Sequence, residues 1–312
     1  MYAIQTDQLT RSFGELKALD RLTLEIPRGI VFGFLGPNGS GKTTTIRLLL
    51  GLLDADQGSA QVLGFDTKKQ PDEVRLRCGA LLEHNGLYER LSAADNLDYY
   101  GRIWHMSKAA RLQRIRELLE PLDLYTRRNE PIGRWSRGMK QKLAVARTLM
   151  HRPVLVFLDE PTAGLDPVAS AALRDDLASL AAQEGVTIFL TTHNLSEAEK
   201  LCAQVGVIHH GQLLVVGSPA ELRSRTSAPR MYVTGQGITP QTIESLRTNT
   251  LVGKVQERHG ELIIDLNDLS RSHEIIAHLT SAGVQIDEVR KEKADLEEVF
   301  LRLVDEEKQG EA

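Results

Sequence analysis

The sequence GPNGSGKT at residues 36–43 has the residue types and spacing of a phosphate-binding loop. Its glycines allow backbone N–H groups to close around phosphate oxygens, and a helix that begins at the loop adds partial positive charge. We expect Lys42 to reach the β- and γ-phosphates of a nucleotide and the Thr43 hydroxyl to ligate Mg²⁺. The apolar segment 30–35 before the loop and the helical pattern after it are the context that this chemistry requires.

Two carboxylates, Asp159 and Glu160, follow a second apolar segment at residues 154–158. A nucleotide site needs such groups there, because ligands bind at the carboxyl ends of the strands in an open parallel sheet. We expect Asp159 to hold the Mg²⁺ shell and Glu160 to polarise the attacking water, although an acid pair after a strand can also cap a helix. His193 follows a third strand pattern, TIFLTT, and could hydrogen-bond the γ-phosphate; a structural role is the alternative.

The elements that must position these groups alternate along residues 1–225. Short apolar strand patterns are each followed by a helical pattern, which predicts an α/β domain with a largely parallel sheet. The segment at about residues 84–150 lacks this alternation, because its apolar residues follow helical spacing. Ser92 and Ser107 in it have the type and position of helix N-caps. We expect this segment to form a small helical lobe of the domain.

Residues 226–312 contain a second series of elements. Their strand and helix patterns follow the order βαββαβ, which predicts a small α+β accessory domain. Leu296, Val299, Phe300 and Leu303 then recur at i, i+3, i+4 and i+7. This spacing predicts a final amphipathic helix that packs on a neighbouring element.

Composition restricts the possible partners and compartment. The net charge is −4, from 38 basic and 42 acidic residues, so the chain as a whole offers no attraction to nucleic acid. We find no apolar run close to the ~20 residues that span a bilayer and no signal-peptide pattern, and we expect a soluble, cytosolic chain. Cys78 and Cys202 lack metal-site spacing, so we expect buried, inert thiols.

Taken in order, these motifs resemble the ATP-binding subunit of an ABC transporter over residues 1 to about 225. The resemblance implies the P-loop NTPase fold of an ABC-type nucleotide-binding domain, with ATP hydrolysis at its site. In that family the signature, here WSRGMKQ at 135–141, completes the ATP site of the opposite subunit, and the loop AGLD at 163–166 crosses the interface. A homodimer would then contain two identical composite ATP sites.

The resemblance also implies the individual site residues. Phe13 corresponds to the aromatic residue that stacks on adenine, and His193 to the switch histidine. The implied ATP contacts are Phe13, Gly36, Pro37, Asn38, Gly39, Ser40, Gly41, Lys42, Thr43, Thr44, Ser136, Gly138 and Asp166; the implied Mg²⁺ ligands are Thr43, Asp159 and Glu83; the catalytic residues are Glu160 and His193.

Two positions depart from the family pattern. The signature keeps Ser136 and Gly138 but has Trp135, Arg137 and Met139 where leucine, glycine and glutamine are usual. Because Arg137 adds positive charge near an expected phosphate, we interpret the segment as a functional variant. Glu83 stands where the family usually has a glutamine near Mg²⁺, and a carboxylate can still ligate the metal.

The C-terminal block resembles the extension of ATPase subunits of ABC-2-type exporters, including drug exporters. A passive packing or dimerisation role for it is as plausible as a regulatory one. The resemblance implies an exporter ATPase that binds a separate transmembrane permease on the cytoplasmic face of the membrane. The alternative is a soluble ABC-type ATPase that acts on ribosomes or DNA, but this chain has one nucleotide cassette and only a short helical lobe, and no nucleic-acid partner is expected. The sequence does not identify the transported substrate.

Overall fold

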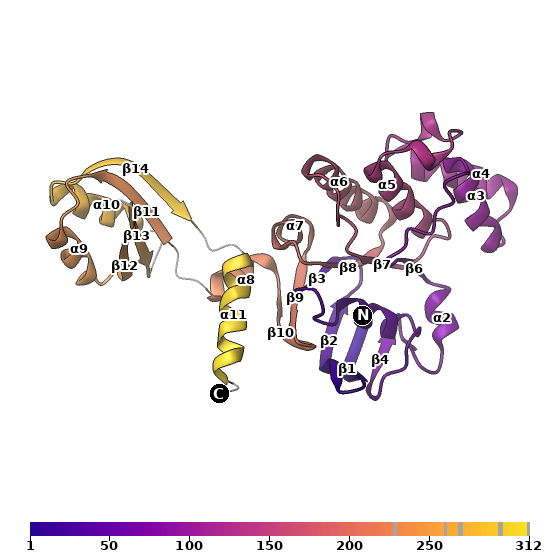
Figure 1. Cartoon of the computed structure of the whole chain (residues 1–312), viewed down its shortest axis with the longest axis horizontal. Helices are drawn as coiled ribbons and strands as arrows, with labels where there is room; N and C mark the ends of the chain where they lie inside the picture. Colours follow the sequence, from indigo (N-terminus) through magenta and orange to yellow (C-terminus); the bar gives the residue numbers. More distant parts are fainter. Residues whose placement is uncertain (227–229, 259–260, 268–270, 293–295, 311–312) are drawn as a thin grey trace. The chain divides into compact units, whose positions relative to one another are not determined.

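The computed structural model describes residues 1–226, 230–258, 261–267, 271–292 and 296–310. The chain forms two compact units, Met1–Ser218 and Pro219–Ala312. The boundary that we expected between residues 225 and 226 therefore lies seven residues earlier. The reason is helix α8 (Pro219–Thr226), which packs against the C-terminal helix α11 (Leu296–Gly310) and so belongs to the second unit (Figure 1).

The first unit begins with an antiparallel sheet that the sequence analysis did not predict. Its strands pair in the order β2-β1-β4-β5, and their bounds are β1 (Tyr2–Phe13), β2 (Leu16–Pro27), β4 (Gln57–Val62) and β5 (Phe65–Asp66). A tight turn joins β1 to β2, because Phe13 pairs with Leu16 and Gly14 between them has φ +60°. Glycine adopts this left-handed conformation without the steric cost that a side chain brings.

A six-stranded sheet forms the centre of the first unit, with the order β10-β9-β3-β8-β7-β6. The strands are β3 (Val31–Leu35), β6 (Cys78–Leu81), β7 (Leu155–Asp159), β8 (Thr187–Thr192), β9 (Gln204–His209) and β10 (Gln212–Gly217). All the pairings are parallel except that of β9 with β10, which confirms the largely parallel sheet. Every residue of β7 and β8 is buried, as expected for strands that are covered on both faces.

Helices leave the central strands at one common edge. Helix α1 (Lys42–Leu49) follows β3. Helix α6 (Pro167–Glu184) follows β7, and α7 (Leu195–Leu201) follows β8 (Figure 1). The carboxyl ends of three neighbouring parallel strands, and the loops that follow them, therefore lie together. This is the edge at which ligands bind in open α/β sheets.

The helical lobe contains α3 (Ala93–Ile103), α4 (Lys108–Leu119) and α5 (Arg137–Thr148), and the short helix α2 (Pro71–Arg75) precedes β6. The two predicted N-caps are confirmed: Ser92 accepts a hydrogen bond from Asp95 N, and Ser107 accepts one from Ala110 N. Buried Arg114 of α4 donates to both carboxylate oxygens of Glu184 at 2.8 Å. This bidentate pair fixes α4 to the end of α6.

The second unit confirms the predicted βαββαβ order. Its elements are β11 (Arg230–Gln236), α9 (Pro240–Arg247), β12 (Val252–Arg258), β13 (Glu261–Leu266), α10 (Ser272–Ser281) and β14 (Gln285–Glu292). The strands form one antiparallel sheet with the order β12-β13-β11-β14. The predicted final helix is α11, in which Leu296 and Val299 are buried. Within the described residues, no helix is both long enough and apolar enough to cross a bilayer.

Candidate nucleotide-binding and hydrolysis site

The loop between β3 and α1 has the shape of an anion cradle. A Cβ atom at Gly36 would collide with the carbonyl oxygen of Ile208, and one at Gly41 would collide with that of Ala18. Gly41 also has φ +107°, so neither position accepts a side chain. The hydroxyl of Ser40 is buried in this loop without a hydrogen-bond partner. A phosphate oxygen fits this environment, because it would accept from both the hydroxyl and the backbone N–H groups at the start of α1.

Lys42 is buried at the centre of the cradle. Its Nζ donates to the carbonyl oxygens of Gly36 at 2.8 Å and Pro37 at 3.0 Å, and lies 3.2 Å from Glu160 Oε1. These contacts hold a full positive charge beside the loop, where it can meet the β- and γ-phosphates. A phosphate in the loop would compete with the two carbonyl groups for the same ammonium group.

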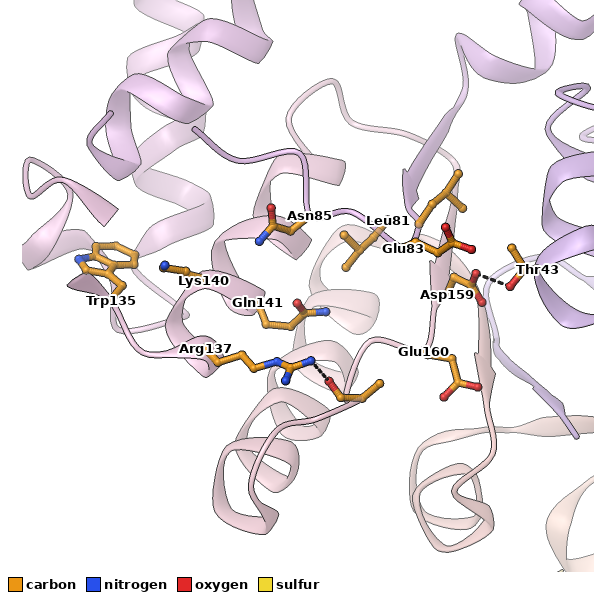
Figure 2. A pocket seen from close by; sticks show the side chains of 12 residues that line it. Thr43, Leu81, Glu83, Asn85, Trp135, Arg137, Lys140, Gln141, Asp159 and Glu160 are labelled. Atoms are coloured by element: carbon orange, nitrogen blue, oxygen red, sulfur yellow. Dashed lines mark hydrogen bonds between the residues drawn. The ribbon is translucent and has the colours of Figure 1, made fainter. Parts of the chain in front are cut away.

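Two threonine hydroxyls bind Asp159 at the end of β7. Thr43 Oγ1 donates to Asp159 Oδ2 at 2.7 Å, and Thr191 Oγ1 donates to Asp159 Oδ1 at 2.5 Å. The predicted Mg²⁺ ligands Thr43 and Asp159 are therefore adjacent (Figure 2). The sequence analysis missed Thr191, although a polar residue at the carboxyl end of the buried strand β8 is a signal that could have indicated it.

Glu160 lies between two basic side chains. Its Oε1 is 3.2 Å from Lys42 Nζ, and its Oε2 is 2.6 Å from His193 Nδ1. The backbone of Glu160 has φ +50°, in the left-handed region that residues other than glycine rarely adopt. Its N–H group donates to the Thr191 carbonyl at 3.2 Å and to the Thr191 hydroxyl at 3.0 Å. The structure thus brings the two predicted catalytic residues into contact, beside the phosphate loop.

The third predicted metal ligand, Glu83, lines the same 510 Å³ cavity as Thr43 and Asp159. Its carboxylate accepts from Arg47 Nη2 of α1 at 3.3 Å, and its side chain is mostly exposed. In the part of the chain that the structure describes, no group of three histidine, cysteine or acidic side chains is arranged to hold a metal ion. In proteins, Mg²⁺ is usually held by one or two carboxylates together with substrate phosphates.

A second cavity of about 480 Å³ adjoins the phosphate loop. Phe13, Leu16 and Ala18 form its apolar side, and Arg11 lies over the Phe13 ring at 4.9 Å. Phe13 is 46% exposed, so a flat aromatic ligand can reach this residue from solvent. The residues that contribute the polar side are Asn38, Gly39, Gly41, Lys42, Thr43, Thr44, Glu160 and His193.

The remaining predicted ATP contacts have partners within this chain. Ser136 caps α5 and accepts from Met139 N at 3.2 Å, while Asp166 caps α6 and accepts from the N–H groups of Val168 and Ala169. Of the residues described, Ser136, Gly138 and Asp166 line neither cavity. Their predicted contacts with nucleotide require a second subunit and stay predictions.

Unlike Ser136 and Gly138 of the signature segment, Arg137 lines a cavity of its own chain. It lines the 510 Å³ cavity together with Asp159 and Glu160, and its Nη2 donates to the carbonyl oxygen of Ala163 at 2.9 Å. Figure 2 shows its side chain extended from α5 toward the loop that follows Glu160. Within this chain the guanidinium binds backbone, and the expected effect of its positive charge on a nearby phosphate stays a prediction.

Family models match both units of the chain. The model described as ABC transporter matches residues 19–163, which include the phosphate loop, the signature segment, Asp159 and Glu160. The model described as ATP-binding protein DrrA1-3-like, C-terminal domain, matches residues 217–304. The second match begins within two residues of the boundary between the two units.

Among curated relatives, the daunorubicin resistance ATP-binding protein DrrA2 of Streptomyces coeruleorubidus is 34% identical over 97% of this chain and 95% of its own length. The bacitracin transport ATP-binding protein BcrA of Bacillus licheniformis is 42% identical over 68% of each chain. A solved structure of an ATP-binding subunit of an ABC transporter, 29% identical, covers 72% of this chain and 92% of its own with a TM-score of 0.63. The chain therefore belongs to the ABC transporter family, as an ATP-binding subunit of the ATP-hydrolysing type.

Proposed function

We propose that this chain powers the export of an antibiotic-like compound by an ABC-2-type transporter, in which it binds the cytoplasmic face of a separate membrane subunit. The resemblance to drug-resistance ATPases extends over both units, and this is the observation that carries the proposal. ABC transporter ATP-binding subunits work with separate membrane subunits. The printed roles of two relatives, daunorubicin resistance and bacitracin transport, support an antibiotic as the class of substrate.

ATP binds, in this proposal, along the edge where β3, β7 and β8 end. The adenine stacks on the exposed face of Phe13, and the phosphates lie in the loop 36–43 against Lys42. Thr43 and Asp159 hold Mg²⁺, which when bound neutralises charge on the phosphates. The adjacent hydroxyl and carboxylate oxygens fit this ion, because Mg²⁺ prefers hard oxygen ligands.

Glu160 acts as the general base for hydrolysis. Its carboxylate lies beside the phosphate loop and within hydrogen-bond distance of His193, which orients it and contacts the γ-phosphate. When Lys42 engages the phosphates, its contact with Glu160 Oε1 weakens and leaves that oxygen to accept a proton from water. The products are ADP and inorganic phosphate.

Two copies of the chain close around two ATP molecules. Ser136 and Gly138 of each copy contact the nucleotide that the other copy holds. A ligand at 100 times its dissociation constant stabilises the state that it binds by about 2.7 kcal/mol, and two sites double this contribution. Closure of the dimer then moves the membrane subunit, and hydrolysis resets it.

The test is ATP hydrolysis by the purified chain, alone and reconstituted with its membrane subunit. The Glu160→Gln variant should bind ATP but hydrolyse it at least ~10²-fold more slowly, the usual scale for a missing general base. Glu120→Gln is a matched control, because Glu120 forms an exposed pair with Arg116 on α4 and lies in neither cavity. Absence of hydrolysis by the reconstituted parent, or normal turnover by Glu160→Gln, would contradict the proposal.

A further inference from the structure

Two side chains of α5 contact the turn that follows Glu160. Arg137 Nη2 donates to Ala163 O at 2.9 Å, and Gln141 Nε2 donates to Pro161 O at 2.7 Å. The two residues are four apart in the helix, so they project from the same face, one turn from each other. Together they bind the backbone at both ends of the segment Pro161 to Ala163.

This segment is connected directly to Glu160. Ala163 N donates to Glu160 O at 3.0 Å, so the same peptide segment that receives the Arg137 bond closes a turn on Glu160. Thr162 Oγ1 donates to Glu197 Oε2 of α7 at 2.6 Å and fixes the opposite side of the turn. Because Glu160 has φ +50°, its orientation depends on these surrounding contacts.

The space beside the turn fits the Arg137 guanidinium closely. Gly164 has φ +70°, and a Cβ atom at this position would overlap the guanidinium group. The absence of a side chain at Gly164 therefore lets the guanidinium lie against the backbone of the turn while its Nη2 reaches Ala163 O. The same group faces the cavity that Glu160 lines, as Figure 2 shows.

We propose that Arg137 is a positioning residue that couples the signature helix α5 to Glu160 of its own chain. This inference rests on the proposed role of Glu160 as the general base. Movement of α5 and the helical lobe shifts the segment Pro161 to Ala163 through its two side-chain bonds, and the turn transmits this shift to the Glu160 carboxylate. Hydrolysis thus becomes sensitive to the position of the lobe in the chain that supplies the base.

Kinetics of single variants provide the first test. Arg137→Ala should lower kcat for ATP by about 3- to 10-fold, the loss that corresponds to one exposed hydrogen bond, and leave KM within about twofold. Arg137→Lys keeps a charged donor and should recover part of the lost kcat. Arg134→Ala is the charge-matched control, because Arg134 is exposed three residues earlier and lines neither cavity; its kcat should stay within about twofold of the parent. Equal kcat for the parent and Arg137→Ala would overturn the proposal.

A second test separates positioning of Glu160 from contact with a nucleotide on the facing subunit. Arg137→Ala is added to Glu160→Gln, and ATP-driven dimer formation is measured by size-exclusion chromatography over a range of ATP concentrations. If Arg137 acts through Glu160, the Glu160→Gln variant and the double variant should form the dimer at the same ATP concentration. The kcat of the double variant should then be no lower than that of Glu160→Gln alone. A higher ATP requirement in the double variant would overturn the proposal in favour of a phosphate contact. Normal hydrolysis by Glu160→Gln alone would instead reject the proposed function, whatever Arg137 does.

Discussion

Replacing Thr191 by valine removes one hydroxyl group from the centre of the site and keeps nearly the same side-chain shape. That hydroxyl donates to Asp159 Oδ1 at 2.5 Å and accepts from Glu160 N at 3.0 Å. Thr191 is fully buried, so water cannot replace the lost group. The Glu160 N–H group retains the Thr191 carbonyl as a second acceptor, but Asp159 Oδ1 loses its hydroxyl donor.

The expected cost follows from these partners. A hydrogen bond to a charged group contributes about 1.5–3 kcal/mol, so Thr191→Val should lower the free energy of unfolding by about 2 kcal/mol. Thr187→Val is a matched control at the opposite end of the same strand, where the hydroxyl accepts a neutral bond from Gly29 N at 2.9 Å. Its loss should cost only about 1 kcal/mol, because the bond is uncharged and Gly29 is exposed to water.

Two measurements on each variant test this role: the free energy of unfolding and the Mg²⁺ dependence of hydrolysis. The two tryptophans, Trp104 and Trp135, lie in the first unit, so urea unfolding followed by tryptophan fluorescence reports the stability of that unit. The Mg²⁺ concentration for half-maximal hydrolysis should rise about 10-fold in Thr191→Val, since loss of a group that orients a metal ligand typically weakens affinity 10- to 100-fold. It should not change in Thr187→Val. Equal destabilisation in the two variants with unchanged Mg²⁺ dependence would refute the role of Thr191 in orienting Asp159.

Two further predictions concern buried groups outside the site. Burial lowers the pKa of His151 to about 4, below the ~6.5 of the unfolded chain, so stability should fall as the pH drops below 6.5, by at most about 2 kcal/mol between pH 7 and 5. Urea unfolding at several pH values should show this loss in the parent but not in His151→Gln. Burial raises the pKa of both Cys78 and Cys202 to about 12, so iodoacetamide at pH 8 should label neither thiol before unfolding and both after it; rapid labelling of the native chain would contradict their burial.

The parts of the site that could be predicted are those whose chemistry depends on local order in the chain. The loop 36–43 must follow a strand and begin a helix, and both signals lie within a few residues of it. Asp159 and Glu160 follow an unbroken apolar strand pattern, and this pattern predicted that they lie at the carboxyl edge of the sheet. The spacing of apolar residues likewise predicted the order of elements in the second unit, because each strand and helix there has a distinct period.

The parts that could not be predicted depend on pairing between distant segments. The antiparallel sheet needs β1 to pair with β4, which lies more than 40 residues later, and no periodicity specifies that partner. The domain boundary was placed too late for the same reason, since α8 joins the second unit through α11, about 70 residues further along the chain. The role of Thr191 required knowledge that β8 lies next to β7, so that its hydroxyl meets Asp159.

In the signature segment, one residue could be predicted from local sequence, whereas the contact of the next depends on a distant segment. Ser136 has the residue type and position of an N-cap, and the structure places it at the start of α5 with its hydroxyl accepting from Met139 N. The direction of the next side chain is not determined by the helix alone, because an exposed residue in the first turn has several rotamers available. A glycine 27 residues later provides the space that the Arg137 guanidinium occupies, and the adjacent carbonyl of Ala163 provides its acceptor. Residues of a distant segment, Ala163 and Gly164, therefore determine where the Arg137 guanidinium lies, and the order of residues around position 137 does not specify this contact.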